Sequence, residues 1–233
     1  MSVTPQPTSP KVHISTHPLV LSKLTQLRLH DLPNKEFREG IKAIGWVHVM
    51  AHTLHASRHQ PGVDIRTQLG YTVPDLQSPI APFTGHTVPL RIGLSPILRA
   101  GTGLVDGALE LFPDATVLHL GLFRDKVTLQ AIEYYSKLPG EVTADLVFLL
   151  DPMIATGGTA LAALTMLTEW GLTQNQIKMV SVVGSAQGVK HIAEEFPDVE
   201  IFIGAVDDEL TEKGYISPGL GDAGDRLFNT HHK

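Results

Sequence analysis

One segment in the middle of the chain constrains the fold more than any other. Five consecutive apolar residues, Leu146–Leu150, lead directly into a loop with two adjacent glycines, and a helix-forming stretch follows at 158–170. A strand without polar interruptions is typical of a parallel sheet that helices cover on both faces. We therefore expect this strand, loop and helix to be one unit of an α/β fold.

The same alternation of strands and helices extends over most of the chain. We predict further strands at 90–94, 116–122, 179–183 and 199–203, and helices at 18–29, 35–58, 101–111 and between the last two strands. The pattern predicts an α/β fold with a mainly parallel, twisted sheet flanked by helices. In such sheets ligands bind beyond the carboxyl ends of the strands, so functional residues are expected in the loops there.

The length of 233 residues suits a single domain. Residues 1–16 are rich in proline, serine and threonine and are predicted to form a flexible tail, and residues 17–233 are expected to form the domain. The proline-rich segment 60–89 is expected to be an extended β-arm outside the core.

Composition excludes several classes of protein. The chain has no cysteine, which excludes disulfides, thiolate nucleophiles and cysteine-ligated metal sites. Its formal net charge of −6 disfavours a broad surface for nucleic-acid phosphates. No apolar stretch is long enough to span a membrane, and Met1–Pro7 lack the features of a secretory signal. We expect a cytoplasmic enzyme that binds neither membrane nor nucleic acid.

The loop after the central strand has the composition of a phosphate-binding turn. Its residues are Asp151, Pro152, Met153, Ile154, Ala155, Thr156, Gly157, Gly158 and Thr159. The glycines allow several backbone N–H groups to approach one anion, and the helix N-terminus that follows favours negative charge. The carboxylate at the strand end can accept hydrogen bonds from sugar hydroxyls. Gly-Gly alone would indicate only an ordinary turn, because the loop matches neither a Walker motif nor the GxGxxG fingerprint.

An arginine follows each of the predicted strands at 90–94 and 116–122. Arg99 lies in Ser95-Pro96-Ile97-Leu98-Arg99-Ala100-Gly101, and Arg124 lies in Gly121-Leu122-Phe123-Arg124-Asp125. A guanidinium has a fixed charge and several donors, which suits a diphosphate.

The segment Gly214–Arg226 contains four glycines and a proline in thirteen residues. It is therefore not expected to form the interior of a regular helix or strand. A loop of this kind exposes its own N–H and C=O groups, which suit a planar base with alternating donors and acceptors on one edge.

These segments together resemble the uracil-specific branch of the type I phosphoribosyltransferases. The loop at 151–159 is similar to the family's PRPP-binding loop in its form with a single acidic residue. The two arginine segments are similar to V-P-I-L-R-A-G and G-L-Y-R-D, and the glycine-rich segment to the base-binding hood G-Y-I-V-P-G-L-G-D-A-G-D. The resemblance covers 17–230, and it departs from the family at Ser95 and at 126–127.

The resemblance implies a type I phosphoribosyltransferase fold with an extended β-arm and a C-terminal hood at 205–230. It implies formation of UMP and pyrophosphate from uracil and PRPP, with Mg²⁺ carried on PRPP and no metal held by protein side chains. It also implies a homodimer or homotetramer and allows GTP as an effector. The implied catalytic residues are Arg99, Arg124 and Asp222. Residues 151–159 would bind PRPP with those three, and Ile216, Gly221, Asp222 and Ala223 would bind uracil.

Three alternatives remain open from the sequence. The chain could use another base, such as a purine, although the hood argues against it. It could be a catalytically silent homologue that binds uracil or PRPP and has a regulatory role, although both arginines and the hood aspartate are present. It could be an RNA-binding regulator with the same fold, which the acidic balance disfavours.

A row of histidines lies on one face of the predicted helix at 35–58 and extends past its end. His48, His52, His55 and His59 have helical spacing and continue the apolar face of Phe37, Ile41 and Ile44. Histidines one turn apart can bind zinc, but no carboxylate shares that face. We expect instead that this face forms a contact with another subunit or domain.

Overall fold

The central feature of the molecule is a mainly parallel sheet. The computed structural model describes residues 11–55, 71–87, 90–124 and 131–230, with backbone alone for 51–55, 71–72, 86–87, 124 and 131. Within these residues the strand order is β1-β11-β10-β8-β4-β6-β7, β5 adds to β4 and β9 to β10. All of these pairs are parallel except β6 with β7. The predicted mainly parallel α/β sheet is confirmed.

The elements follow the predicted alternation closely. The strands of the sheet are β1 (Val12–Ile14), β4 (Ile92–Leu98), β5 (Thr116–Val117), β6 (Leu120–Arg124), β7 (Ala131–Ser136), β8 (Leu146–Leu150), β9 (Met153–Ile154), β10 (Ile177–Ser185) and β11 (Glu200–Asp207). The helices are α1 (Pro18–Leu27), α2 (Asn34–His55), α4 (Thr102–Leu109), α5 (Gly158–Trp170), α6 (Ala186–Glu195) and α7 (Ala223–Phe228), with a 3-10 turn at Gln174–Gln176.

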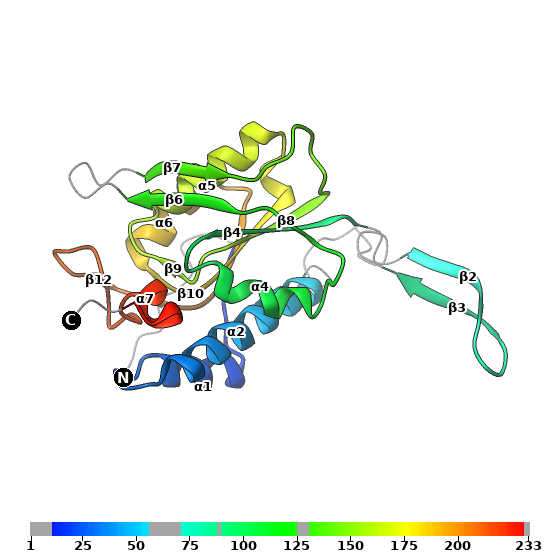
Figure 1. Cartoon of the computed structure of the whole chain (residues 1–233), viewed down its shortest axis with the longest axis horizontal. Helices are drawn as coiled ribbons and strands as arrows, with labels where there is room; N and C mark the ends of the chain where they lie inside the picture. Colours follow the sequence, from blue (N-terminus) through cyan, green and yellow to red (C-terminus); the bar gives the residue numbers. More distant parts are fainter. Residues whose placement is uncertain (1–10, 56–70, 88–89, 125–130, 231–233) are drawn as a thin grey trace.

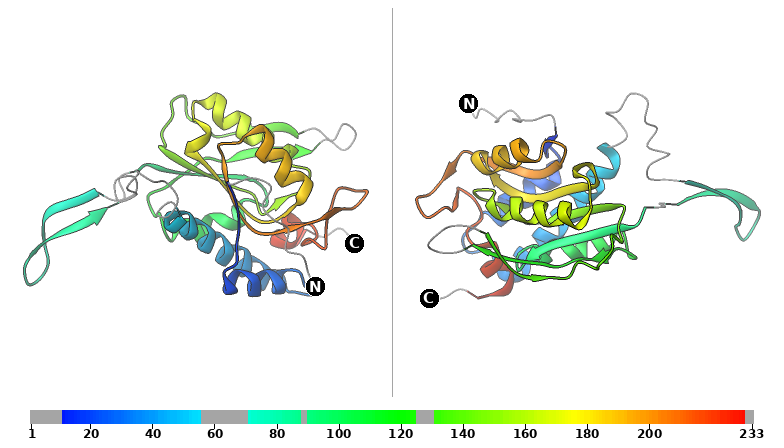
Figure 2. Two further views of the ribbon diagram at one scale, coloured as in Figure 1. Left: turned by 180° about the vertical axis from the view of Figure 1, so that it is seen from behind. Right: turned by 90° about the horizontal axis from the view of Figure 1, so that it is seen from above.

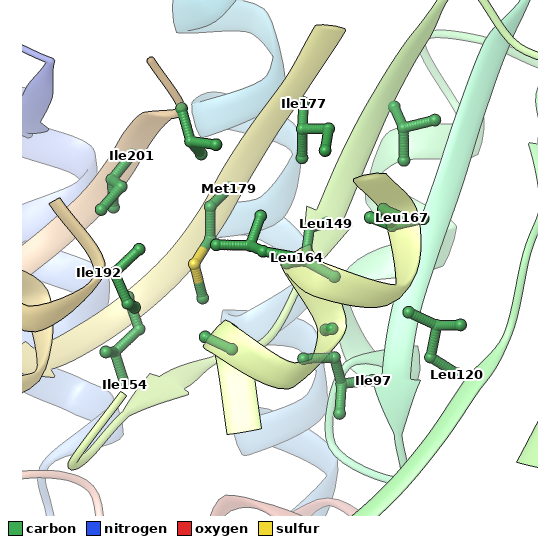
Figure 3. Close-up of a cluster of buried hydrophobic side chains, with 14 of the residues drawn as sticks. Ile97, Leu120, Leu149, Ile154, Leu164, Leu167, Ile177, Met179, Ile192 and Ile201 are labelled. Carbon is green, nitrogen blue, oxygen red and sulfur yellow. The ribbon is translucent and has the colours of Figure 1, made fainter. Parts of the chain in front are cut away.

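The sheet separates two cores, because successive side chains of a strand point to opposite faces. In β8, Val147 and Leu149 pack under α5 and α6, whereas Leu146, Phe148 and Leu150 pack against α2 and α4. Figure 1 shows α5 and α6 on one side of the sheet and α1, α2, α4 and α7 on the other. Figure 3 shows the first core, in which Leu164 and Leu167 of α5 lie beside Leu149 and Met179. Burial on both faces explains why the β8 sequence has no polar residue.

The connections place a crevice at the ends of β4 and β8. After β4 the chain forms α4, which covers one face of the sheet, and then β6, which pairs with β4 on the side away from β8. From β8 it runs through α5, on the other face, to β10 on the other side. The strand order therefore reverses between β4 and β8. Open α/β sheets bind ligands at such a reversal, beyond the carboxyl ends of the strands.

A two-stranded hairpin lies apart from the sheet. The strands β2 (Tyr71–Gln77) and β3 (Pro82–Thr87) pair with each other in antiparallel fashion and with no strand of the central sheet. The hairpin extends away from the helices and the sheet in the views of Figures 1 and 2. It falls within the segment 60–89, for which the sequence predicted an arm.

The structure corrects several boundaries. The predicted tail 1–16 is too long, because Val12–Ile14 pair with Ile201–Ile203 as the edge strand β1. The single strand predicted at 116–122 is two short strands, of which β5 pairs with the middle of β4 and β6 with its end. The segment 214–226 contains a short strand, β13 (Ile216–Ser217), paired with β12 (Glu209–Leu210), and the first residues of α7.

The predicted role of the histidine face is wrong for His48. Its side chain is 2% exposed and lies in the core between α2 and β10, not at a subunit or domain contact. Burial lowers its pKa to about 4, partly opposed by the backbone of Ser181, so the imidazole is neutral at pH 7. The side chains of His52, His55 and His59 lie outside the described residues.

Candidate functional site

The loop after β8 is held against β10 by its backbone. The carbonyl of Pro152 accepts hydrogen bonds from the amides of Val182 (3.0 Å) and Val183 (3.1 Å). The next two residues form β9 and pair with β10 at Val183 and Gly184. The chain then turns at Gly157, which has a left-handed φ of 85° and directly precedes α5. Glycine is favoured at this turn because it adopts positive φ without a steric penalty.

The first turn of α6 supports this loop from behind. The hydroxyl of Ser185 donates to the carbonyl of Ala155 and accepts from the amide of Gly188 at 2.9 Å. A Cβ atom on Gly188 would lie 2.2 Å from the Ala155 oxygen, so only glycine allows this approach. Because C=O and N–H point in opposite directions across a trans peptide, the amide of Thr156 points away from α6.

The amides at the start of α5 are available to an anion. The N-cap position is Gly157, which has no side chain to accept a hydrogen bond from the first turn. The first N–H groups of a helix have no partner within the helix, and the helix dipole favours negative charge beside them. The geometry at 156–159 is therefore that of an anion cradle.

Asp151 has an unusual carboxyl group. It directly follows β8, and its Oδ1 accepts a long hydrogen bond of 3.4 Å from the amide of Met153. Burial raises its pKa to about 7, against the smaller opposing effect of the Met153 amide. Without a ligand the group is thus close to half-protonated at neutral pH. A ligand whose hydroxyls donate to this carboxylate would favour its charged form.

Arg99 follows the adjacent strand, β4, at the same edge of the sheet. Its side chain is about half exposed, with Nη1 3.3 Å from Thr230 Oγ1 and Nη2 3.3 Å from Asp225 Oδ1. The chain leaves β4 through Gly101, where a Cβ atom would lie 2.2 Å from the carbonyl oxygen of Leu150. This contact brings the turn that carries Arg99 against the end of β8.

The hood at 205–230 is attached to the body by two arginines. Arg28 forms a bidentate ion pair with Asp207 at the end of β11, with distances of 2.7 and 2.8 Å. The same carboxylate accepts from the amide of Gly219 at 2.9 Å, and Arg28 also donates to the carbonyl of Gly219 at 3.2 Å. The ion pair therefore fixes one turn of the hood as well as the end of the strand.

Arg226 is buried among carbonyl groups. It donates to the carbonyls of Leu27 (2.6 Å), Leu220 (2.8 Å) and Leu29 (2.7 Å), and its guanidinium lies over the Phe37 ring at 4.1 Å. Burial lowers its pKa. These contacts tie the hood to the two N-terminal helices.

The hood contains glycine turns at Gly219 and Gly221, of which the first is buried and the second is exposed. Gly219 and Gly221 have left-handed φ of 55° and 70°. A Cβ atom on Gly219 would lie 2.2 Å from the carbonyl oxygen of Ile216, so this turn requires glycine. Ile216 is buried within β13.

The short helix α7 brings Asp222 and Arg99 close together. Asp222 caps α7, because its Oδ1 accepts from the amide of Asp225 at 2.9 Å. A Cβ atom on Gly224 would lie 3.3 Å from Asp222 Oδ1 and 3.6 Å from Arg99 Nη2. The aspartate predicted to face both substrates thus lies close to the arginine predicted to bind pyrophosphate.

The topology gathers most of the predicted residues at one edge. Asp151–Thr159 follow β8, Arg99 follows the neighbouring β4, and Asp222 reaches Arg99 through α7. Arg124 ends β6, also at that edge, but its side chain lies outside the described residues. Lys126, Val127, Thr128 and Leu129 also lie outside them.

Sequence reasoning missed the residues that hold the site together. Each of them binds a main-chain group or a site residue: Arg28, Ser185, Gly188, Asp207, Asp225, Arg226 and Thr230. Two of these, Asp225 and Arg226, lie within the glycine-rich run, so that motif contained a signal for them.

Other kinds of site find little support in the described residues. Across 11–55, 71–87, 90–124 and 131–230 no three His, Asp or Glu side chains gather as metal ligands. In the same residues every helix is too short or too polar to cross a bilayer.

A cavity of about 380 Å³ lies between residues 28–34 and the hood turn at 218–222. It shares Gly221 and Asp222 with the predicted site but contains no residue of the loop at 151–159.

Comparison with known proteins assigns nearly the whole chain to one family. The family model described as "Uracil phosphoribosyltransferase" matches residues 14–230. The uracil phosphoribosyltransferase of Roseiflexus sp. strain RS-1 is 47% identical over 220 residues, which are 94% of this chain and 99% of that protein. The uracil phosphoribosyltransferase of Desulfitobacterium hafniense strain DSM 10664 / DCB-2 is 42% identical over 221 residues, again 94% of this chain and 99% of its own length.

A solved structure matches the fold over the same extent. The AQ2163 protein from Aquifex aeolicus is 34% identical, with a TM-score of 0.82. The match covers 95% of this chain and 100% of that chain.

Proposed function

The chain belongs to the uracil phosphoribosyltransferase family, and we propose that its three loops at the sheet edge each bind one part of the substrates. Its activity is that of a uracil phosphoribosyltransferase, a pentosyltransferase that forms UMP and pyrophosphate from uracil and PRPP. The assignment of residues to that reaction is our proposal, and the geometry described above supports it.

The 5′-phosphate of PRPP binds the loop before α5. The uncapped amides at 156–159 and the hydroxyls of Thr156 and Thr159 are its donors. Pro152, Met153, Ile154 and Ala155 shape the loop, and the ribose hydroxyls donate to Asp151. In this proposal C1 of the ribose would lie toward β4 and the hood.

The pyrophosphate of PRPP binds Arg99 and Arg124. Arg99 follows β4 and Arg124 is the last residue of the neighbouring β6 at the same edge of the sheet, which supports a shared ligand. Mg²⁺ would be carried on PRPP and would neutralise pyrophosphate charge. The carboxylates of Asp151 and Asp222 would lie beside the ribose and the pyrophosphate. Because Mg²⁺ would arrive with PRPP, the enzyme would need no metal-binding cluster of its own side chains.

Uracil binds the hood through main-chain groups of Ile216, Gly221 and Ala223. The left-handed turn at Gly221 supports this proposal because this residue is exposed and lies outside any strand. Asp222, which lies near Arg99, would face both the base and PRPP. A neutral base read by main-chain groups needs no charged pocket.

The reaction forms a bond between a ring nitrogen of uracil and C1, while the bond from C1 to the pyrophosphate oxygen breaks. Positive charge develops on the ribose as pyrophosphate leaves with the bonding electrons, and the uracil nitrogen loses its proton. The residues contribute orientation of the two reactants, stabilisation of the leaving group by Arg99 and Arg124, and exclusion of water. We assign no residue as the proton acceptor.

The observation that carries this proposal is the convergence of Arg99, Asp222 and the loop at 151–159 on one edge of the sheet. Arg99→Ala should lower kcat/KM for PRPP about 100-fold or more, since a charged donor to the leaving group is lost. The matched control is Arg91→Ala, at the opposite end of the same strand, where the arginine pairs with Asp145. Equal activity of both variants would refute the pyrophosphate assignment.

The base is tested by UMP formation from uracil, PRPP and Mg²⁺, with cytosine, adenine, guanine, hypoxanthine and orotate in parallel. Product from uracil alone is the expected result. Uracil binding without product from any base would instead favour the silent regulatory homologue.

The finer partner assignments are also proposals. We propose a homodimer or homotetramer, which the exposed apolar residues of the β2–β3 hairpin, Ile80 and Phe83, support. We propose GTP as a candidate effector by family membership, and cytoplasmic location because PRPP is too highly charged to cross a membrane unaided. Light scattering and an assay with added GTP test the first two.

A further inference from the structure

Asp225 is a carboxylate near the proposed site that has no assigned role. It lies in α7, three residues after Asp222, and its side chain is 27% exposed. Its Oδ1 accepts from Thr230 Oγ1 at 2.7 Å and lies 3.3 Å from Arg99 Nη2. Asn229, with a left-handed φ of 56°, ends the helix and returns the chain so that Thr230 lies beside Asp225. The pair is therefore built by the local fold.

These two residues hold the guanidinium of Arg99 in one orientation. Nη1 of Arg99 is 3.3 Å from Thr230 Oγ1 and Nη2 is 3.3 Å from Asp225 Oδ1, while the Phe228 ring centre lies 6.0 Å from Cζ. A guanidinium has five N–H donors, so this leaves most of them for a ligand. A long, half-exposed arginine loses considerable rotamer freedom when it binds, and a partner that already restricts it reduces that loss.

Asp225 belongs to the hood, so it connects Arg99 directly to that segment. The amide of Asp225 donates to Asp222 Oδ1 at 2.9 Å, so one turn of helix joins the aspartate beside the base to the partner of Arg99. Gly224 lies between the two side chains, where it leaves room for both. A movement of the hood would therefore also move the partner of Arg99.

We propose that Asp225, supported by Thr230, is a positioning residue that holds Arg99 for the pyrophosphate of PRPP and connects that arginine to the base-binding hood. The inference rests on the proposed role of Arg99. Asp225 itself does not touch the reacting atoms. Its carboxylate fixes the direction of the guanidinium, and a displacement of about 1 Å at such a group lowers the rate by up to about 100-fold.

The test is a double-mutant cycle on kcat/KM for PRPP. Asp225→Asn should lower it about 10- to 100-fold in the otherwise unchanged enzyme, mainly through KM for PRPP, with KM for uracil changed far less. In the Arg99→Ala background Asp225→Asn should have little further effect, because the residue it positions is already absent. Thr230→Val, which keeps the carboxylate, should give a smaller loss of the same kind.

The control is Asp114→Asn, an exposed carboxylate in the turn between α4 and β5. It should change neither kinetic constant. An equal loss from Asp225→Asn with and without Arg99 would overturn the inference, since the residue would then act independently. So would wild-type kinetics in both Asp225→Asn and Thr230→Val. If Arg99→Ala itself were fully active, the proposed function of Arg99 would fail instead, which separates the two failures.

Discussion

Asp151 occupies a position where its charge is unfavourable until a ligand arrives. Burial raises the pKa of its carboxyl to about 7 from an unfolded value near 3.8. At pH values between 3.8 and about 7 the folded state therefore keeps a proton on this carboxyl, whereas the unfolded state has lost it. The stability contributed by the neutral form is present below the unfolded pKa and is lost as the pH rises through about 7.

Replacement of this carboxyl by a neutral amide should remove that pH dependence. Asp151→Asn should raise Tm above the wild-type value by about 3 to 8 °C at pH 8, and the difference should shrink as the pH is lowered from 8 to 5. The same variant should lose most of its activity, because an amide accepts hydrogen bonds from the ribose hydroxyls more weakly. Thermal melts across this pH range and UMP assays measure both effects. A variant less stable than wild type at pH 8 would contradict the burial argument.

At the residue scale the sequence predicted candidate ligand-binding groups but not their ionisation. Asp151 and Arg99 were identified from the motifs that contain them. The raised pKa of Asp151 and the contact between Arg99 and Asp225 depend on burial and on α7, which no local pattern encodes. His48 shows the same limit, because its spacing placed it on the apolar face but its complete burial under β10 follows from packing.

At the scale of elements, the loop at 151–159, the proposed phosphate loop, contacts a helix from the next unit of the sheet. The first turn of α6 contacts the loop before α5 through Ser185 and Gly188. The carbonyl of Ala155 lies where a side chain of residue 188 would be. The loop and α6 must therefore pack without any Cβ atom between them.

Gly188→Ala should displace the phosphate loop, because the new methyl group would lie 2.2 Å from a backbone oxygen. We expect KM for PRPP to rise about 10-fold or more and Tm to fall by several degrees, with KM for uracil less affected. Gly140→Ala is the matched control, since a Cβ atom there meets nothing within 4 Å. Steady-state kinetics with both substrates provide the measurement. Similar PRPP constants for the two variants would show that α6 does not support the loop.

Elements with a single strong pattern were predicted well. The bounds of β8 and α5 agree with the prediction because β8 is a continuous buried run and α5 is flanked by Gly157 and Gly171. Short elements were missed for an equally physical reason. The two-residue strand β5 and the six-residue helix α7 have too few residues to show a period, and β1 forms because β11 offers an open edge.

At the scale of the whole molecule, the C-terminal hood is fixed by the N-terminal helices. Arg226 donates to the carbonyls of Leu27 and Leu29, and Arg28 pairs with Asp207. These partners are far apart in the sequence, and several of them are main-chain carbonyls. Side-chain patterns carry no information on such contacts, which explains why the hood was predicted as a loop but its attachment was not.

The ion pair between Arg28 and Asp207 can be tested against a second pair of the same type in this chain. Asp207 is 8% exposed and Arg28 is 23% exposed, whereas Arg91 and Asp145 form a bidentate pair near the surface. Asp207→Asn removes the negative charge that pairs with Arg28. It also places the NH₂ group of an amide beside the N–H donors of Arg28 and Gly219. We expect a loss of about 2 to 4 kcal/mol and a fall in Tm of about 5 to 12 °C. Asp145→Asn should lower Tm much less.

The kinetic consequence distinguishes a hood anchor from a general stabilising contact. Asp207 also holds the amide of Gly219, two residues before Gly221, so its loss should loosen the turn that we propose binds uracil. At a temperature where Asp207→Asn remains folded, KM for uracil should rise about 5-fold or more while KM for PRPP changes little. Denaturation melts and kinetics for both substrates provide the comparison. If Asp207→Asn and Asp145→Asn lost equal stability and left KM for uracil unchanged, the N-terminal helices would not hold the hood in place.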